Sequence, residues 1–386
     1  MMLFLKLLFR NAFRHKLRTG LTILGIAIAI LAFGMLRTMI TAWYSGVEAS
    51  SAGRLVTRNS ISLAFSLPLN YKDKIQQTSG VKIVSYGNWF GGIYIDEKNF
   101  FANFAVEPKS YLELYPEFIL PSDEETAFIL DRKGFIAGRK LVDKYGWKIG
   151  STVTLKGTIY PGNWDFILRG IYRGKDRTTD ETQFIFHWDY LNENMKIKSP
   201  RRADQVGFYM IGVSHPDMAS DVAVSIDKLF KNSLAETLTE TEKAFTLTFI
   251  SMTEAIVTVI RIVSFFVIFI IMAVVANTMI MTTRERIGEY AALKALGFKG
   301  FHIAVMIFGE AFVIAMLGCA IGIAVTFPIA HIFAENLSTY FPIFYVEQKT
   351  ILLDIAAATA VGFVAALIPT RKAVMIRIAD GLRRIG

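Results

Sequence analysis

Four long apolar segments, separated by polar stretches of very unequal length, dominate the pattern along this chain. They cover residues 19–43, 262–281, 302–330 and 350–369. Because an α-helix rises about 1.5 Å per residue, roughly 20 apolar residues cross the hydrocarbon core of a bilayer. The pattern therefore predicts four transmembrane helices. The basic start before the first segment is also compatible with a signal peptide, but no convincing small-x-small cleavage site follows, which favours an uncleaved span.

The longest polar stretch, residues 44–240, alternates short strand-like runs with turn residues and two helical patterns. It predicts a mixed α/β extracytoplasmic domain inserted between the first and second transmembrane helices. From about Leu238 to Arg261 the pattern is helical, so residues 241–281 are expected to form a stalk that continues without a break into the second span. The expected strands are Val81–Tyr86, Gly92–Ile95, Phe101–Val106, Thr152–Leu155, Phe166–Tyr172 and Val206–Val213; the expected helices are Ile136–Tyr145 and Met218–Phe230, the second capped by Asp217.

Lysine and arginine residues indicate the orientation in the membrane. They are concentrated in residues 1–18, in the loop 282–301 and in the tail 370–386, whereas the loop 331–349 has Lys349 alone. By the positive-inside rule, both termini lie in the cytoplasm and the large domain lies outside the cell (inner) membrane. Residues 1–18 are amphipathic as well as basic, so they are expected to lie along the inner surface against anionic lipid.

Composition and charge exclude several classes of protein. The 386-residue chain is 53% hydrophobic, too apolar for a soluble globular protein with 19% charged residues. Its net charge of +9 collects beside the apolar spans and is no sign of nucleic-acid binding. The single cysteine, Cys319, lies inside a span, which rules out a disulfide framework and favours an inert packing role.

A search for catalytic or nucleotide-binding motifs finds none. No GxxxxGK[ST] sequence occurs, since Gly174-Lys175 is followed by Asp176, and neither HExxH nor GxSxG is present. No metal site or cofactor is expected, and the chain is not expected to be an enzyme. Asn277 and Glu310 fall inside spans, Arg37 lies near the far end of the first span and Asp354 near the outer end of the fourth. A proton-coupled carrier would need more buried carboxylates, so Glu310 is better explained as a partner for arginine or lysine at the inner membrane edge.

The stretch Thr283–Gly297 between the second and third spans is charged and helical in pattern. Ile287, Ala291 and Leu293–Leu296 form an apolar stripe, and the charged side chains lie mostly on other sides. A short amphipathic helix of this kind suits docking against a soluble partner. An ordinary solvated turn would account for the composition equally well.

Four segments of the chain resemble the MacB/FtsX-type permeases of ABC transporters, the type VII or mechanotransmission class. RNAFRHKLRTGLTILGI (residues 10–26) is similar to the opening of these proteins, and FIAGRKLVDKYGWKIGSTVTLKG (135–157) to the core of their periplasmic domain. ANTMIMTTRERIGEYAALKALG (276–297) resembles their loop motif and ALIPTRKAVMIRIADGLR (366–383) their closing segment. Tyr290-Ala291 replaces the usual Ile-Gly, and Ile378-Ala379-Asp380 replaces a common Pro-Val-Glu.

The resemblance implies a permease subunit that transmits the ATP-driven motion of a separate ATPase to its extracytoplasmic domain. Two ATPase copies would carry the ATP and Mg²⁺, and the permease would pair with a second copy of itself or a related permease. A periplasmic adaptor or lipoprotein is a further expected partner. The implied coupling residues are Arg284, Glu285, Arg286, Glu289, Lys294 and Gly297.

Several functions fit this architecture. The cargo is expected to be an amphipathic, peptide or lipid-like substrate for efflux or extraction. Lipoprotein release, regulation of a cell-wall hydrolase, and an ATPase-independent binding or signalling role are alternatives. Replacing Glu289 or Arg286 is expected to reduce ATPase coupling while leaving the fold intact.

Overall fold

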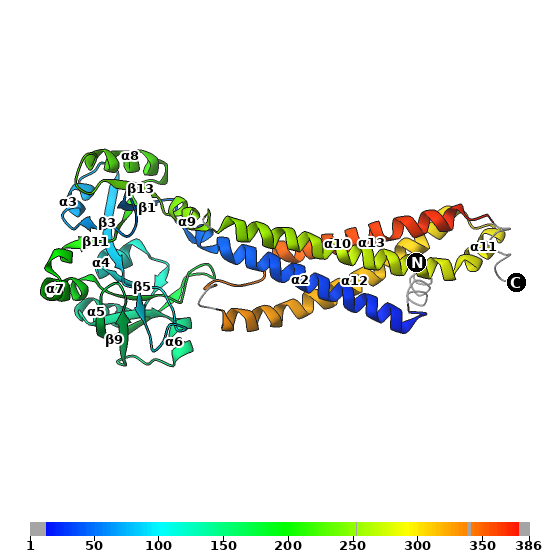
Figure 1. Ribbon diagram of the computed structural model, residues 1–386, viewed down its shortest axis with the longest axis horizontal. Coiled ribbons are helices and arrows are strands. Elements are labelled where there is room, and N and C mark those ends of the chain that lie inside the picture. The colour runs from blue at the N-terminus through cyan, green and yellow to red at the C-terminus, as the bar shows by residue number, and fades with distance from the viewer. Residues whose placement is uncertain (1–12, 252, 338–340, 378–386) are drawn as a thin grey trace. The chain divides into compact units, whose positions relative to one another are not determined.

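The computed structural model describes residues 13–251, 253–337 and 341–377 (Figure 1). The chain divides into two compact units, described separately below. The membrane unit comprises Met1–Ala42, Glu254–Glu335 and Phe344–Gly386, and the inserted domain comprises Trp43–Thr253 and Asn336–Ile343. Most of the expected amphipathic segment 1–18 lies outside the described residues.

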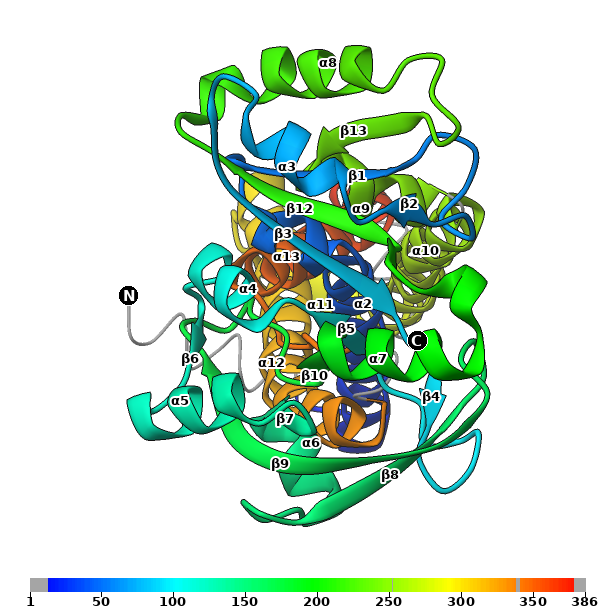
Figure 2. The ribbon, with the colours of Figure 1, turned by 90° about the vertical axis from the view of Figure 1, so that its left-hand side faces the viewer.

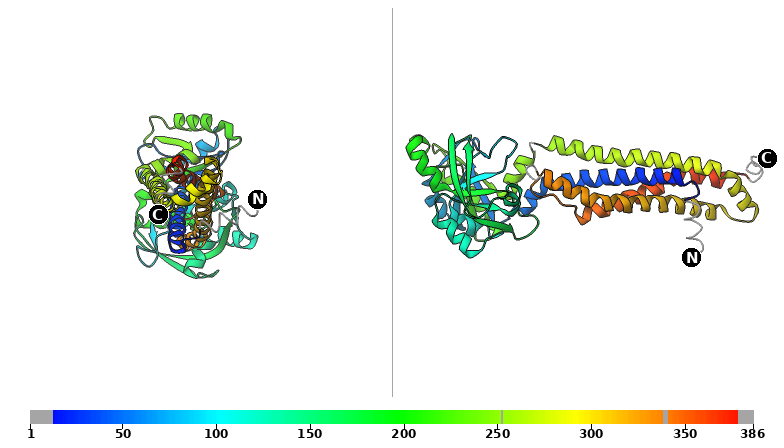
Figure 3. Two further views of the ribbon diagram at one scale, coloured as in Figure 1. Left: turned by 90° about the vertical axis from the view of Figure 1, so that its right-hand side faces the viewer. Right: turned by 90° about the horizontal axis from the view of Figure 1, so that it is seen from below.

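Four helices in the described part of the chain are long and apolar enough to cross a membrane. They run side by side in the membrane unit (Figure 3). These four helices, with a mixed α/β domain between the first and the second, confirm the predicted fold class. Their bounds are α2 Lys16–Ala49, α10 Glu254–Glu285, α12 Gly300–Asn336 and α13 Gln348–Met375, and the short helix α11, Ile287–Ala295, joins α10 to α12.

Small residues let the spans approach closely. A Cβ atom added to Gly318 of α12 would lie 2.6 Å from the Cβ of Ile26 in α2. One added to Gly322 would lie 2.8 Å from the carbonyl oxygen of Ala27. Without a hydrophobic force between helices in lipid, such close contact is a main source of association.

Prolines lie inside two of these helices. Pro369, expected near the end of the fourth span, is followed by helix up to Met375, and Pro328 lies inside α12. Membrane helices tolerate proline because neighbouring helices and side chains satisfy the carbonyl group that it frees.

The inserted domain is built on a mixed, largely antiparallel sheet (Figure 2). Its strand order is β13-β1-β12-β3-β5-β10-β7-β9-β8-β4, with β6 paired to β9. The β5–β10 and β7–β9 pairs are parallel. The strands are β1 Arg54–Asn59, β3 Val81–Trp89, β4 Gly92–Ile93, β5 Asn103–Val106, β6 Phe118–Ile119, β7 Gly134–Gly138, β8 Thr152–Gly157, β9 Gly162–Gly174, β10 Phe184–His187, β12 Phe208–Val213 and β13 Thr237–Thr241; β2 Leu67–Pro68 and β11 Gln205–Val206 form a separate pair.

Aromatic side chains fill the main core of this domain. Phe135 and Phe184 stack with their ring centroids 3.9 Å apart. Phe166 packs against Phe184, and Phe90 packs against Phe166 and Trp164 in the same buried cluster. A second buried cluster contains residues of α4, α5 and neighbouring strands. The helices are α3 Tyr71–Gln76, α4 Pro108–Leu114, α5 Ser122–Leu130, α6 Arg139–Tyr145, α7 Trp188–Lys198, α8 Ala219–Leu229 and α9 Glu242–Ser251.

Two expected helices begin later than the sequence pattern suggested. The helix expected at Ile136–Tyr145 starts at Arg139, because residues 134–138 form the fully buried strand β7 between β10 and β9. A short, continuously apolar run does not distinguish a buried strand from a helix. Asp217 is not the cap of α8; it lies in a 3₁₀ turn, Pro216–Met218, and Met218 precedes the helix.

The expected continuous stalk is replaced by three elements. Residues 237–241 form the edge strand β13, which pairs with β1. Helix α9 then ends at Ser251, and α10 begins at Glu254 after a turn at Thr253. The threonine-rich stretch before Glu242 has the β-branched composition of a strand, and sheet pairing outweighs its helical spacing.

Candidate functional site

Helix α11 forms the connection between the ends of α10 and α12 (Figure 1). Arg286, with φ −102° and ψ 11°, leaves the helical conformation and separates α10 from α11. At the other end, Gly297 adopts φ +95°, a conformation that glycine supplies without strain. The amide of Phe298 donates to the carbonyl of Leu293 at 3.1 Å, the helix-ending pattern that such a glycine allows.

Arg286 is buried in an ion-pair cluster. Its guanidinium donates to Glu310 Oε2 of α12 at 2.8 Å and to Glu289 Oε2 at 3.0 Å. The side chains of Arg286 and Glu310 are only 7% and 5% exposed. Glu310 is therefore the partner of an arginine at the edge of a span, as the sequence indicated.

The electrostatics of the cluster favour its charged forms. Burial alone would lower the pKa of Arg286, but Tyr290, Glu310 and Glu289 outweigh it and raise that pKa above its ordinary value. Burial would raise the pKa of Glu289, but Arg14 and Arg286 hold it below its usual range. Burial raises the pKa of Tyr290, whose ring lies 5.3 Å from the Arg286 guanidinium, to about 12.

Other charged residues of the expected coupling helix also bind within the membrane unit. Arg18 of α2 donates to both carboxylate oxygens of Glu285 at 2.9 and 2.6 Å, and Arg14 pairs with Glu289. Lys294 Nζ donates to the carbonyl oxygens of residues 374 and 376, at and just beyond the end of α13, at 2.6 and 2.8 Å.

The two remaining coupling candidates, Arg284 and Gly297, are exposed. Asn277 in α10 is also exposed. Sequence reasoning placed all six candidates at a docking surface. In the structure four of them make contacts inside the unit. In particular, the expectation that replacing Arg286 leaves the fold intact conflicts with its buried, paired position.

Large apolar side chains of this connection are exposed, next to the exposed Lys299. Leu296 is 78% exposed, Phe301 is 74% exposed and Phe298 is 46% exposed. With the exposed residues Ala292 and Ala295 they form what we call the apolar tip. The sequence analysis did not identify Phe298 and Phe301. The pattern that could have indicated their exposure is that they flank Lys299-Gly300 in a connection too short to bury them.

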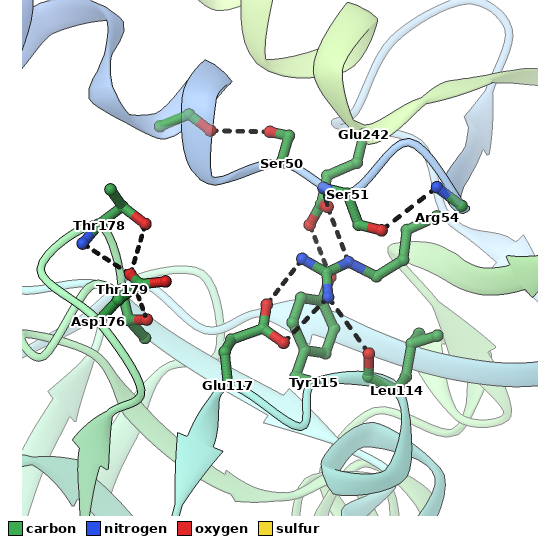
Figure 4. A network of polar contacts seen from close by, with 12 residues as sticks. Ser50, Ser51, Arg54, Leu114, Tyr115, Glu117, Asp176, Thr178, Thr179 and Glu242 are labelled. Atoms are coloured by element: carbon green, nitrogen blue, oxygen red, sulfur yellow. Dashed lines mark hydrogen bonds and ion pairs between the residues drawn. The ribbon is translucent and has the colours of Figure 1, made fainter. Parts of the chain in front are cut away.

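A second buried ion-pair cluster lies in the inserted domain (Figure 4). Arg54, at the start of β1, donates through Nε to Glu242 Oε2 at 2.8 Å and lies 2.7 Å from Glu117 Oε1. Its guanidinium lies 4.3 Å from the centre of the Tyr115 ring, and the Ser51 amide also donates to Glu242.

This Arg54 cluster ties together three chain segments: the residues that follow α2, the first residue of α9, and the loop between α4 and β6. Burial would lower the pKa of Arg54, but Glu242 and Glu117 raise it above its ordinary value. No motif in the sequence pointed to this cluster. Among the described residues no group of three or more histidine, cysteine, aspartate or glutamate side chains is arranged to hold a metal ion.

Comparisons with known proteins identify the membrane unit. A family model described as the C-terminal region of FtsX-like permeases matches residues 261–377, which include α11, Glu310 and the apolar tip. The uncharacterized ABC transporter permease MJ1507 of Methanocaldococcus jannaschii is 22% identical over 408 aligned positions, covering 97% of this chain and 96% of that protein. The matched region, residues 261–377, is that of an FtsX-like permease, and the chain as a whole is similar to an ABC transporter permease.

Two further similarities cover parts of the permease. A probable export ATP-binding/permease protein of Pseudomonas fluorescens, Pfl01_2215, is 27% identical over 110 residues, which are 28% of this chain and 17% of that protein. The extracellular domain of the ABC-type transporter YknZ from Gram-positive bacteria is 12% identical and aligns with 49% of this chain and 100% of its own, with a TM-score of 0.35. In this chain a mixed α/β domain is inserted between the first two of the four helices that are long and apolar enough to cross a membrane.

Proposed function

We propose that this permease docks onto a separate ATPase through the apolar tip and transmits the motion of that ATPase to its inserted domain. The supporting observation is the division of side chains around α11. Arg286, Glu289 and Lys294 are tied to the rest of the membrane unit, whereas Leu296, Phe298 and Phe301 are exposed. A partner surface is the simplest use for exposed large apolar side chains on a short connection between spans.

The connection is held firmly enough to act as a lever. Glu285 binds Arg18 of α2, and Glu289 binds Arg14 in the turn just before α2. Arg286 binds Glu310 of α12, and Lys294 binds the end of α13. A push on the apolar tip therefore reaches every span instead of bending α11 alone. Transmission by rigid elements needs this property.

In this proposal ATP and Mg²⁺ are bound by two copies of the partner ATPase, and the permease acts as a dimer with both termini in the cytoplasm. The chain itself contributes no nucleotide chemistry, in keeping with the missing GxxxxGK[ST] motif. The Arg54 cluster would carry movement of the segments after α2 and at α9 into the α4–β6 loop. An amphipathic, peptide or lipid-like cargo remains a prediction.

Affinity purification of the tagged full chain from the membranes of the cells that make it tests the proposal. The wild-type chain should retain a P-loop ATPase in a 1:1 ratio, identified by mass spectrometry and by vanadate-sensitive ATP hydrolysis. Burying a leucine or phenylalanine side chain contributes about 1.5–3 kcal/mol, and about 1.4 kcal/mol is a factor of ten in affinity. Leu296→Asp and Phe298→Asp should each therefore weaken ATPase retention at least about tenfold.

A matched control is Leu234→Asp, which places the same charge at a fully exposed leucine of the inserted domain. It should leave ATPase retention unchanged. If no ATPase accompanies the wild-type chain, the ATPase-independent binding or signalling role takes precedence. If an ATPase binds wild-type and Leu296→Asp chains equally, the assignment of the apolar tip is wrong while the permease function stands.

A further inference from the structure

Two oppositely charged residues in the half of the membrane unit away from α11 have polar atoms without partners. Asp354 of α13 is 1% exposed, and its Oδ1 atom has no hydrogen-bond partner among the described residues. Arg37 of α2 has a buried Nε atom with none either. Burying an unpaired polar or charged atom is costly, so each of these atoms calls for an explanation.

Arg37 lies one helical turn from the point where Asp354 packs on α2. A Cβ atom added to Gly34 of α2 would lie 3.1 Å from Asp354 Oδ2, so the carboxyl group packs directly on α2 at this glycine. Arg37 is three residues further along the same helix, and side chains with this spacing are neighbours, about 5–6 Å apart at Cβ. The long, flexible arginine side chain can cover that distance by rotation alone.

Other groups around Asp354 do not serve as its partner. The hydroxyl groups of Thr38 and Thr326 donate to the carbonyl oxygens of Gly34 and Gly322 in their own helices, at 2.8 Å each. The titratable group of α12 that faces Asp354 is the buried thiol of Cys319. No cation lies within ion-pair distance of Asp354 in residues 13–251, 253–337 and 341–377.

The opposite end of the same unit shows what a closed pair looks like. There, the buried side chains of Arg286 and Glu310 are in contact at 2.8 Å. Ionisable side chains inside membrane proteins are generally paired with one another. We propose that Arg37 and Asp354 form an intramembrane ion pair, which we call the latch, in a second side-chain arrangement that is populated in the bilayer. In the structure the latch is open.

The latch would hold α2 to α13 close to the point where α2 leaves the membrane unit. The helix α2 continues along the chain into β1 of the inserted domain. The Arg37–Asp354 pair would therefore fix the position of the span that leads directly to that domain. This inference does not depend on the ATPase proposal, since it concerns contacts within one chain.

A double-mutant cycle in lipid nanodiscs tests the latch. The full-length chain carries Arg37→Gln, Asp354→Asn or both, and the midpoint of thermal unfolding is measured. The double variant should unfold no lower than the less stable single variant, because the second substitution removes a partner that is already lost. Exchanging the charges, Arg37→Asp with Asp354→Arg, should recover most of the loss caused by Arg37→Asp alone. Additive effects or no recovery would overturn the proposal.

Infrared spectroscopy of the same nanodiscs gives a second readout that does not depend on stability. A paired Asp354 is ionised, so Asp354→Asn should remove intensity from the carboxylate bands and leave the protonated carboxylic-acid band unchanged. Loss of the acid band instead would mean that Asp354 is an isolated protonated acid, and the latch would be refuted. Arg37→Gln combined with Glu310→Gln is the matched control: the two residues belong to separate pairs, and their effects should add.

Discussion

Replacing Glu310 with glutamine tests the buried ion pair that it forms with Arg286 in the membrane unit. At 2.8 Å, the attraction between Arg286 and Glu310 is roughly 6 kcal/mol for an effective dielectric constant of 20. Desolvation of the two ions offsets much of this attraction in the intact pair. Removing one partner of such a buried pair costs about 3–5 kcal/mol, because the remaining charge is left buried.

Glu289 still contacts Arg286 in the Glu310→Gln variant, so we expect a loss near 3 kcal/mol, the lower end of that range. Arg286→Gln should cost about as much, and the double variant less than the sum of the two. The assay is thermal unfolding of the purified full-length chain in detergent, followed by near-ultraviolet circular dichroism. If Glu310→Gln is as stable as the wild type, the pair does not hold α11 to α12 and the lever interpretation fails.

Three further predictions concern the rest of the chain. Arg54→Met leaves Glu117 and Glu242 without their shared cation and should destabilise the protein by about 3 kcal/mol in thermal unfolding. Arg169→Met removes a more exposed ion pair with Asp131 and should destabilise it by less than about 1 kcal/mol. Gly322→Ala should lower the stability by about 1–3 kcal/mol, because its Cβ would meet the Ala27 carbonyl group at 2.8 Å. Gly20→Ala, with open space around it, should not. Equal unfolding midpoints of the two variants would contradict the close packing of α2 on α12. Burial lowers the pKa of His187 in the folded chain. The unfolded chain therefore binds a proton at this histidine at a higher pH than the folded chain does, and stability should fall as the pH drops below about 6.5. His187→Gln should flatten the fall in unfolding midpoint between about pH 7.5 and about pH 5.5, and an unchanged fall would refute this assignment.

The sequence predicted the membrane-spanning helices well, because an apolar run of 20 or more residues is rarely used for anything except crossing a bilayer. It predicted the strands of the inserted domain well where apolar and polar residues alternate, as in β8, Thr152–Gly157. It failed where strands are buried on both faces or lie next to a helix. The strand β7 was assigned to the start of α6, and β13 was assigned to a stalk helix. Both segments are strands because they pair with strands that are distant in the chain, and a local sequence pattern does not contain that pairing.

The candidate site shows the same limit at the level of side chains. The pattern located the connection between α10 and α12 and identified Glu310 as the partner of a basic residue. It did not show which side of α11 faces inward. Arg286 and Lys294 were expected at the surface because charged residues usually are, but their partners, Glu310 and the carbonyl groups at the end of α13, are 24 or more residues away in the chain. Contacts over such separations depend on how the spans pack.

The orientation of side chains around α11 has a consequence for docking. If Arg286, Glu289 and Lys294 formed the partner surface, each would have to leave an intrachain contact on binding, and Arg286 would leave a buried one. The cost of exposing Glu310 without its arginine would oppose association. An apolar tip avoids this conflict, since the exposed side chains of Leu296 and Phe301 have no ion pair to give up when a partner covers them. The ion pairs then remain closed while the ATPase moves, and the connection can pass on the motion without first being dismantled.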